Sequence, residues 1–150
     1  RTRPSSRSFR KFQKEVGERL LAKPGSKNYG SLSVFAQLAA EARLVCRVPP
    51  AAFQPPPQVE SLVLSFDLRG APALPREQWE SFENFVKAGF AHRRKMLRQN
   101  LRPVLGGVEA SEVERRLKAI GAAVGARAEE LSVGQWVELF ATVPSRPPRC

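Results

Sequence analysis

A segment rich in proline and glycine, R-G-A-P-A-L-P at residues 69–75, separates two parts of this 150-residue chain that differ in patterning. Helical and strand patterns alternate before it, and the hydrophobic periodicity is helical throughout after it. Two strands are predicted, at residues 43–48 and 59–67, and two such strands need neighbours to cover both of their faces. The pattern therefore predicts the end of a larger sheet, a linker at 69–75 and a whole helical lobe.

The first eleven residues, R-T-R-P-S-S-R-S-F-R-K, are basic and nearly free of apolar side chains. We expect residues 1–11 to be a disordered basic tail. From Phe12 apolar residues recur at every fourth position, which predicts a helix that ends at Pro24–Gly25. The loop after this helix offers one aromatic side chain, Tyr29, as a candidate for exposure.

An alanine-rich stretch at residues 31–42 predicts a second helix, with Leu32, Phe35 and Ala39 on its apolar stripe. The segment A-A-F-Q-P-P-P-Q at residues 51–58 follows the first strand. Three consecutive prolines fix φ and remove backbone donors, so this segment is predicted to be stiff and extended.

After the linker, residues 76–101 carry a helical apolar stripe, within which Gly89 marks a candidate break. Two capping boxes are predicted further on. The first pairs Ser111 with Glu114, and the second pairs Ser132 with Gln135. Around the second box, Leu131 and Trp136 occupy the positions of a hydrophobic staple.

The chain carries a formal net charge of +11, with 25 basic and 14 acidic residues. A charge this high indicates a polyanionic partner, most often nucleic acid. An anionic membrane surface is the less common alternative, and we expect no membrane partner. No run of eighteen apolar residues is present, which rules out a membrane span. Two cysteines, Cys46 and Cys150, and one histidine, His92, provide neither a disulfide framework nor a metal site. We therefore expect a reducing, intracellular compartment.

The basic residues are concentrated in F-A-H-R-R-K-M-L-R-Q-N-L-R at residues 90–102, and the chain has no acidic residue between Glu83 and Glu109. On a continuous helix, cations one turn apart would form a ridge suited to backbone phosphates, with Met96, Leu97 and Leu101 facing the core. An ordinary solvated face is the alternative. The candidate phosphate-binding residues are Arg93, Arg94, Lys95, Arg98 and Arg102.

Phe53 stands on the proline-rich segment just before the second strand. A rigidly held aromatic at a strand edge can stack on a flat ring such as a flipped base. The alternative is a core phenylalanine beside prolines that only shape the connection. Glu15 and Glu18 are predicted to be solvated on one helix. Ser26 and Ser33 have no base partner, so nucleophilic catalysis has no support.

Three sequence blocks, taken together and in order, resemble the small-subunit ribosomal RNA adenine dimethyltransferases in their bacterial form. They are F-Q-K-E-V-G-E-R-L-L-A-K-P-G-S-K-N-Y-G-S-L-S-V at residues 12–34, V-P-P-A-A-F-Q-P-P-P-Q-V-E-S at 48–61 and F-A-H-R-R-K-M-L-R-Q-N-L at 90–101. The resemblance covers residues 12–141. It implies an α/β plus α architecture: the C-terminal part of a Rossmann-like methyltransferase sheet, followed by a small all-helical rRNA-binding domain.

In the domain layout implied by the resemblance, residues 12–68 belong to the methyltransferase domain and 76–143 to the helical domain, with a loose tail at 144–150. The implied activity is methyl transfer from S-adenosylmethionine to N6 of two adjacent adenines near the 3′ end of small-subunit rRNA. The implied setting is ribosome biogenesis in the cytoplasm, with a monomer acting on the pre-ribosomal small subunit. Phe53 matches the aromatic that stacks on the target adenine. The residues that match the rRNA-contacting helix are Arg93, Arg94, Lys95 and Arg98.

This chain also departs from the family pattern. It has neither the glycine-rich cofactor loop, G-x-G-x-G, nor the catalytic segment N-L-P-Y. The basic residues 1–11 stand where the family has an apolar strand, which suggests a truncated or frame-disrupted upstream region. Gln58 replaces a usual lysine and Met96 a usual threonine. We therefore expect no catalytic, cofactor-binding or metal-binding residue in this chain, no binding of S-adenosylmethionine and no activity from the chain alone.

Two other interpretations stay open. The first is a non-enzymatic RNA-binding or ribosome-assembly module that uses the same basic ridge. The second is an antibiotic-resistance methyltransferase that acts on large-subunit rRNA and shares the fold. The block at residues 90–101 favours the small-subunit branch.

Overall fold

The computed structural model forms two compact units, Arg1–Ala73 and Leu74–Cys150, and their boundary falls inside the segment predicted to be a linker. It describes residues 7–52, 54–56, 58–69 and 73–143. The expectations for residues 1–6, for Phe53 and for the tail at 144–150 lie outside the described residues.

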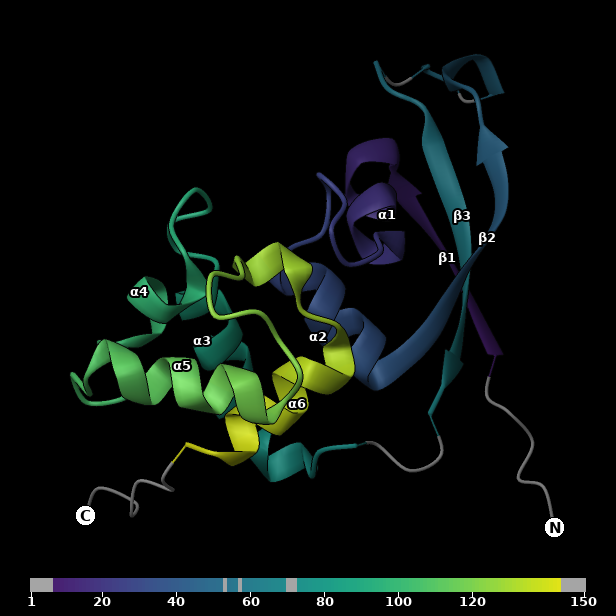
Figure 1. Ribbon diagram of the computed structural model, residues 1–150. Coiled ribbons are helices and arrows are strands. Elements are labelled where there is room, and N and C mark those ends of the chain that lie inside the picture. Colours follow the sequence, from purple (N-terminus) through teal and green to yellow (C-terminus); the bar gives the residue numbers. More distant parts are fainter. Residues whose placement is uncertain (1–6, 53, 57, 70–72, 144–150) are drawn as a thin grey trace, which may run out of the picture. The chain divides into compact units, whose positions relative to one another are not determined.

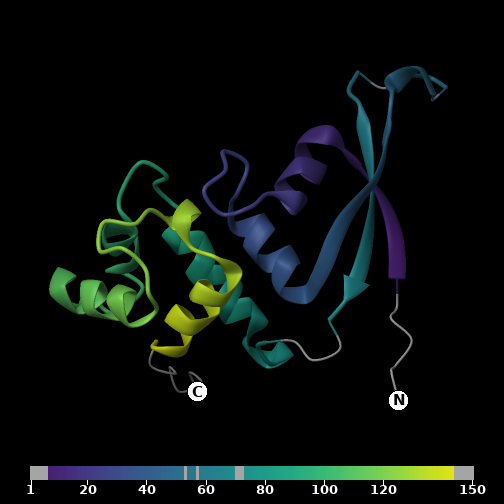
Figure 2. The same cartoon turned by 45° about the vertical axis from the view of Figure 1, so that its right-hand side comes forward.

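The first unit is a three-stranded antiparallel sheet with two helices on one face (Figures 1 and 2). Its strands are β1 (Arg7–Gln13), β2 (Ala40–Val48) and β3 (Ser61–Leu68), in the order β1-β3-β2. The helices α1 (Lys14–Leu21) and α2 (Ser31–Ala39) cover the face that carries Leu62 and Leu64 of β3, and these leucines pack with Leu20 of α1. The two predicted strands are confirmed as β2 and β3.

The prediction of a disordered tail is wrong for residues 7–11, because they form most of β1. Every residue of β1 pairs with β3, from Arg7 opposite Asp67 to Gln13 opposite Ser61. The Arg7 Nε lies 3.2 Å from the Asp67 carboxylate, and the Phe12 ring meets Phe66 edge-on at 5.9 Å. Pairing with a central strand thus overrides a local composition that is unfavourable for a strand.

The second helix is shorter than predicted, since α2 ends at Ala39 and β2 begins at Ala40. Its buried face also differs from the predicted stripe. Val34 and Leu38 are buried, whereas Leu32 is 43% exposed. Both faces are apolar in the sequence, so periodicity alone could not choose between them.

The aromatic side chain expected to be exposed, Tyr29, is completely buried, and this burial raises the pKa of its phenol. The turn around Tyr29 is held by Ser33 of α2. The Ser33 hydroxyl donates to the carbonyl oxygen of Arg19 and accepts from the backbone N–H of Gly30. A buried hydroxyl thereby ties the end of α1 to the start of α2.

The segment at residues 51–58 was predicted to be extended. The chain here begins instead with a short 3₁₀ helix, η1 (Pro50–Ala52).

The second unit is helical, but the helix predicted over residues 76–101 is broken. It divides into η2, α3, an irregular segment at residues 90–96 and a five-residue α4. The break falls directly after Gly89, the residue that marked it in the sequence. The elements of this unit are η2 (Arg76–Gln78), α3 (Trp79–Gly89), α4 (Leu97–Leu101), α5 (Ala110–Ala119), η3 (Ala128–Glu130) and α6 (Val133–Ala141).

Trp136 of α6 is at the centre of the helical unit and is completely buried. Its ring meets Phe85 of α3 edge-on at 6.0 Å and stacks on Phe90 at 5.6 Å. Phe140 meets Phe82 and Phe85 of α3 at 5.4 and 5.6 Å. Aromatic pairs of this kind contribute about 0.5–1.5 kcal/mol each beyond the area that they bury. Together they fix α6 against α3.

The two predicted capping boxes have opposite outcomes. The box at Ser132 is confirmed: its hydroxyl accepts from the Gln135 N–H at 3.2 Å, and the Gln135 side chain accepts from the Ser132 N–H at 3.0 Å. The staple residues beside this box, Leu131 and Trp136, are both buried. The box at Ser111 is wrong, because α5 begins at Ala110 with Glu109 as its N-cap, two residues before the predicted cap.

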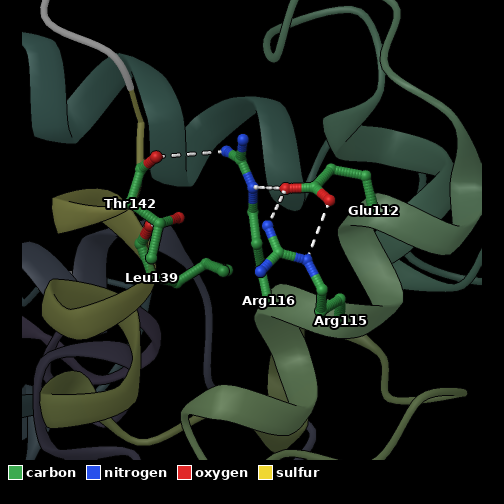
Figure 3. Close-up of polar contacts among 5 residues, drawn as sticks. All are labelled: Glu112, Arg115, Arg116, Leu139 and Thr142. Carbon is green, nitrogen blue, oxygen red and sulfur yellow. Dashed lines mark hydrogen bonds and ion pairs between the residues drawn. The ribbon is translucent and has the colours of Figure 1, made fainter.

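A charged cluster joins α5 to the end of α6 (Figure 3). The Glu112 carboxylate accepts hydrogen bonds from Arg115 at 2.6 and 2.9 Å and from Arg116 at 3.0 Å. Arg116 also donates to the carbonyl oxygen of Thr142 at 3.2 Å, just beyond α6. These hydrogen bonds from Arg115 and Arg116 lower the pKa of Glu112 to about 2.

We therefore predict that Glu112 makes the stability of the chain sensitive to acid. Its pKa is about 2 in the folded chain against an ordinary 4.5, so the stabilisation is complete above pH 4.5 and is lost as the pH falls towards 2. Thermal unfolding followed by circular dichroism should show a smaller fall in Tm over this window for Glu112→Gln than for the wild type. The control is Glu109→Gln, since the Glu109 side chain is exposed and has no partner among the described residues. Equal falls for all three proteins would contradict the prediction.

Candidate nucleic-acid interface

Residues 90–96, which we call the basic loop, connect α3 to α4 and hold Arg93, Arg94 and Lys95. These residues do not continue a helix, so the predicted ridge of Arg94, Arg98 and Arg102 on successive helical turns is wrong. The cations are still close in the chain, but they lie on a loop, on the short α4 and on the turn after it. Leu97 and Leu101 are buried as predicted, whereas Met96 is 38% exposed.

Two of the five predicted phosphate-binding residues are engaged in ion pairs with acidic residues from later in the chain. Arg93 lies 3.4 Å from the carboxylate of Glu129 in η3. Arg98 pairs with Glu114 of α5, and both side chains of this pair are partly buried. The sequence between Glu83 and Glu109 has no acidic residue, but the fold supplies counter-charges to it from η3 and α5. Arg98 is primarily a link between α4 and α5.

The other three predicted residues, Arg94, Lys95 and Arg102, are exposed and form no ion pair with any described residue. Arg102 uses its Nε to donate to the carbonyl oxygen of Val108 at 3.2 Å. The positive charge of these three side chains is thus available to a partner. Cations on an exposed surface, unneutralised by the protein itself, are suited to contacts with phosphates.

Asn100 fixes the basic loop through two hydrogen bonds, although no pattern in the sequence points to it. Its side-chain amide is buried and donates to the carbonyl oxygens of Gly89 at 2.8 Å and His92 at 3.0 Å. The backbone N–H of Lys95 donates to the same His92 carbonyl at 3.0 Å. One buried side chain therefore fixes the start and the middle of the loop.

The two ends of the basic loop are held by the core. Phe90 stacks on Trp136, and the N–H of Leu97 donates to the carbonyl oxygen of Ala126 at 2.9 Å. Gly89 lies so close to Trp136 that an added Cβ would be 2.5 Å from the indole ring. The absence of a side chain at residue 89 therefore lets α3 end directly against the tryptophan.

Three other features predicted from the sequence concern a metal site, a membrane span and a base-stacking aromatic. In the described ranges, no cluster of three histidine, cysteine, aspartate or glutamate side chains could hold a metal ion. Over those same residues, no helix has the length and apolar character needed to cross a membrane. Phe53, the candidate for base stacking, lies outside the described residues.

The fold and this surface define a protein with two units: a small antiparallel sheet covered by two helices, and a helical unit that bears a cationic loop. The family model for ribosomal RNA adenine dimethylase matches residues 2–144, so the chain belongs to that family. It is 48% identical over 134 residues to ribosomal RNA small subunit methyltransferase A of Syntrophotalea carbinolica, a match that covers 89% of this chain and 50% of the relative. The protein of the same name from Thermosynechococcus vestitus is 48% identical over 130 residues, covering 85% and 46%. The chain thus spans about half the length of these relatives.

Solved structures show the same fold. A dimethyladenosine transferase from Plasmodium falciparum superposes with a TM-score of 0.72 at 22% identity, covering 93% of this chain and 58% of that protein. The 23S rRNA methyltransferase ErmE superposes with a TM-score of 0.64 at 23% identity, covering 91% and 54%. The predicted architecture of a partial methyltransferase sheet followed by helices fits these likenesses.

We predict that Asn100→Ala destabilises the helical unit and loosens the basic loop. The change removes the Asn100 donor from the carbonyls of Gly89 and His92, of which the His92 carbonyl keeps the Lys95 N–H, and should cost about 1–3 kcal/mol. Chemical unfolding measures the stability, and hydrogen exchange at the Lys95 amide measures the loop. Gln99→Ala is the matched control, since Gln99 is exposed and its side chain has no described partner, so its effect should stay within about 0.5 kcal/mol. The positioning role of Asn100 is wrong if the two variants behave alike.

Proposed function

We propose that this chain is the RNA-binding portion of an S-adenosylmethionine-dependent enzyme that dimethylates N6 of two adjacent adenines near the 3′ end of small-subunit rRNA. Its relatives are named for methylation of the ribosomal RNA small subunit, which favours this function over a purely non-enzymatic module. The observation that carries the proposal is the basic loop with its neighbour Arg102, where three exposed cations form no ion pair with a described residue. The partner would be rRNA of the pre-ribosomal small subunit, bound by a monomer in the cytoplasm.

Within this function the candidate residues have different tasks. Arg94, Lys95 and Arg102 would contact phosphates directly. Arg93 and Arg98 would reach RNA only by sharing or leaving their partners Glu129 and Glu114, and a cation already paired inside the protein gains less from a phosphate. Phe53 remains our candidate for stacking on the target adenine.

We predict that reversing Arg94 and Lys95 to glutamate weakens binding to an rRNA hairpin and flattens its salt dependence. Losing two phosphate contacts should reduce the slope of log affinity against log salt by about 1.4–1.8, with repulsion adding to that change. Fluorescence anisotropy over a salt series measures both quantities with the full chain. Neither side chain pairs with a described residue, so circular dichroism should show unchanged helix content.

The matched control for this reversal is Lys118→Glu, because Lys118 is also exposed and without a described ion pair, but lies on α5. This variant should keep a salt slope close to that of the wild type. If the reversal at residues 94 and 95 changes affinity and slope no more than Lys118→Glu does, the basic loop is only a solvated surface and the proposed function is wrong.

The described residues do not fit a methyl-donor site, so we derive no step through the cofactor. In the first unit, β1 passes directly into α1 between Gln13 and Lys14, with no glycine-rich turn at which a backbone could approach a ribose or phosphate. Gly25 is the one glycine with positive φ among the described residues of this unit, and it lies in the turn between two helices. We propose that the chain alone binds RNA without methylating it.

We predict, accordingly, that calorimetric titration of the chain with S-adenosylmethionine gives no saturable heat. The same preparation should bind the rRNA hairpin, which provides the positive control for folded protein. A one-to-one isotherm with the methyl donor would show that a donor site exists in this chain, and it would overturn the proposal that the chain alone is inactive.

A further inference from the structure

A cleft of about 430 Å³ opens in the helical unit beside the basic loop. It lies between the end of that loop, α4 and the turn that follows α4. Its volume falls within the range of about 300–1,000 Å³ that is usual for sites that hold a small molecule. The lining residues are Lys95, Gln99, Arg102, Pro103 and Gly107.

The lining brings together the three kinds of group that a nucleotide needs. Lys95 and Arg102 supply positive charge, and neither forms an ion pair with a described residue. Gln99 is exposed and carries an amide, which can both donate and accept hydrogen bonds. Pro103 supplies an apolar ring. A phosphate, a base edge and the apolar face of a base or ribose each have a matching group.

Two hydrogen bonds shape the turn after α4, which contributes Arg102, Pro103 and Gly107 to the lining. The Gly107 N–H donates to the carbonyl oxygen of Arg102 at 2.8 Å, and the Arg102 Nε donates to the carbonyl oxygen of Val108. Gly107 has a φ of +73°, and a Cβ built on it would have no protein atom within 4 Å. The backbone at Gly107 is therefore bare on the side where a side chain would stand, so a ligand can approach it closely.

We propose that this cleft receives one unstacked ribonucleotide of a bound RNA. Lys95 and Arg102 hold its phosphate, Gln99 hydrogen-bonds its base edge, and Pro103 covers an apolar face. The proposal rests on the proposed function, because RNA is the ligand of the neighbouring basic loop. It adds a preference for single-stranded RNA, since the bases of a duplex are stacked and paired while those of loops and bulges can be splayed into a pocket.

The test adds a side chain to one lining residue without removing any cation. Gly107→Asn places a side chain in the lining, and asparagine tolerates a left-handed backbone better than most residues. The matched control is Gly106→Asn: Gly106 has a φ of +79° and an equally open Cβ direction, but it lines a different cleft whose described lining has one charged side chain, that of Glu77. Both variants should therefore carry the same backbone strain.

Anisotropy of the full chain with a short single-stranded RNA and with an RNA duplex gives the readout. Gly107→Asn should lose about tenfold in affinity for the single strand, the size expected for one lost base contact, and little for the duplex. Gly106→Asn should stay within about twofold of the wild type on both probes. The proposal is overturned if the two variants bind the single strand equally well, or if Gly107→Asn weakens both probes alike.

A second measurement separates a nucleotide site from a simple anion site. Adenosine monophosphate should displace the single-stranded RNA from the wild-type chain at concentrations where inorganic phosphate does not. Equal displacement by the two competitors overturns the assignment of a nucleotide. If the cleft proposal is overturned but reversal of Arg94 and Lys95 still weakens binding of both RNA probes, the proposed function stands. If that reversal leaves the binding of both probes unchanged, the proposed function itself is wrong.

Discussion

The helical unit depends on the packing of Trp136 against the end of α3. The indole is completely buried, stacks on Phe90 and meets Phe85 edge-on. It leaves no room for a side chain at residue 89, where an added Cβ would be 2.5 Å away. Because α3 ends here, the chain leaves the helix at a fixed point, and the basic loop that follows has a fixed start. The position of the cations is therefore set by the core rather than by their own helix.

The same unit decides which cations remain available to RNA. Glu129 and Glu114 come from η3 and α5 and pair with Arg93 and Arg98, so a sequence-level count of positive charges overstates the charge that the loop presents. Arg94 and Lys95 are not neutralised by any described residue. Surface ion pairs of this kind contribute little to stability, with a median of about 0–1 kcal/mol. Their larger consequence is to leave Arg94, Lys95 and Arg102 as the unneutralised candidates, of which Lys95 and Arg102 line the cleft.

Local signals predicted the features that depend on neighbouring residues, including β2, β3 and the capping box at Ser132. The failures involve contacts between distant residues. Residues 7–11 form a strand because β3 pairs with them, and Glu114 pairs with Arg98 instead of capping α5 at Ser111. At the candidate site the sequence identified the cations, but not Asn100, whose role requires two carbonyls from another segment to meet its amide. A buried asparagine five residues after a lysine gives no such signal by itself.

Hydrogen exchange along the full chain, compared with and without a bound rRNA hairpin, shows directly whether the basic loop is the RNA interface. We expect new protection of backbone amides at residues 93–96 and 102–108, where the unpaired cations and the cleft lie. The exposed face of α5 around Lys118 should change little. Protection confined to α5 and α6, with residues 93–96 and 102–108 unaffected, would contradict the placement of the RNA interface on the basic loop.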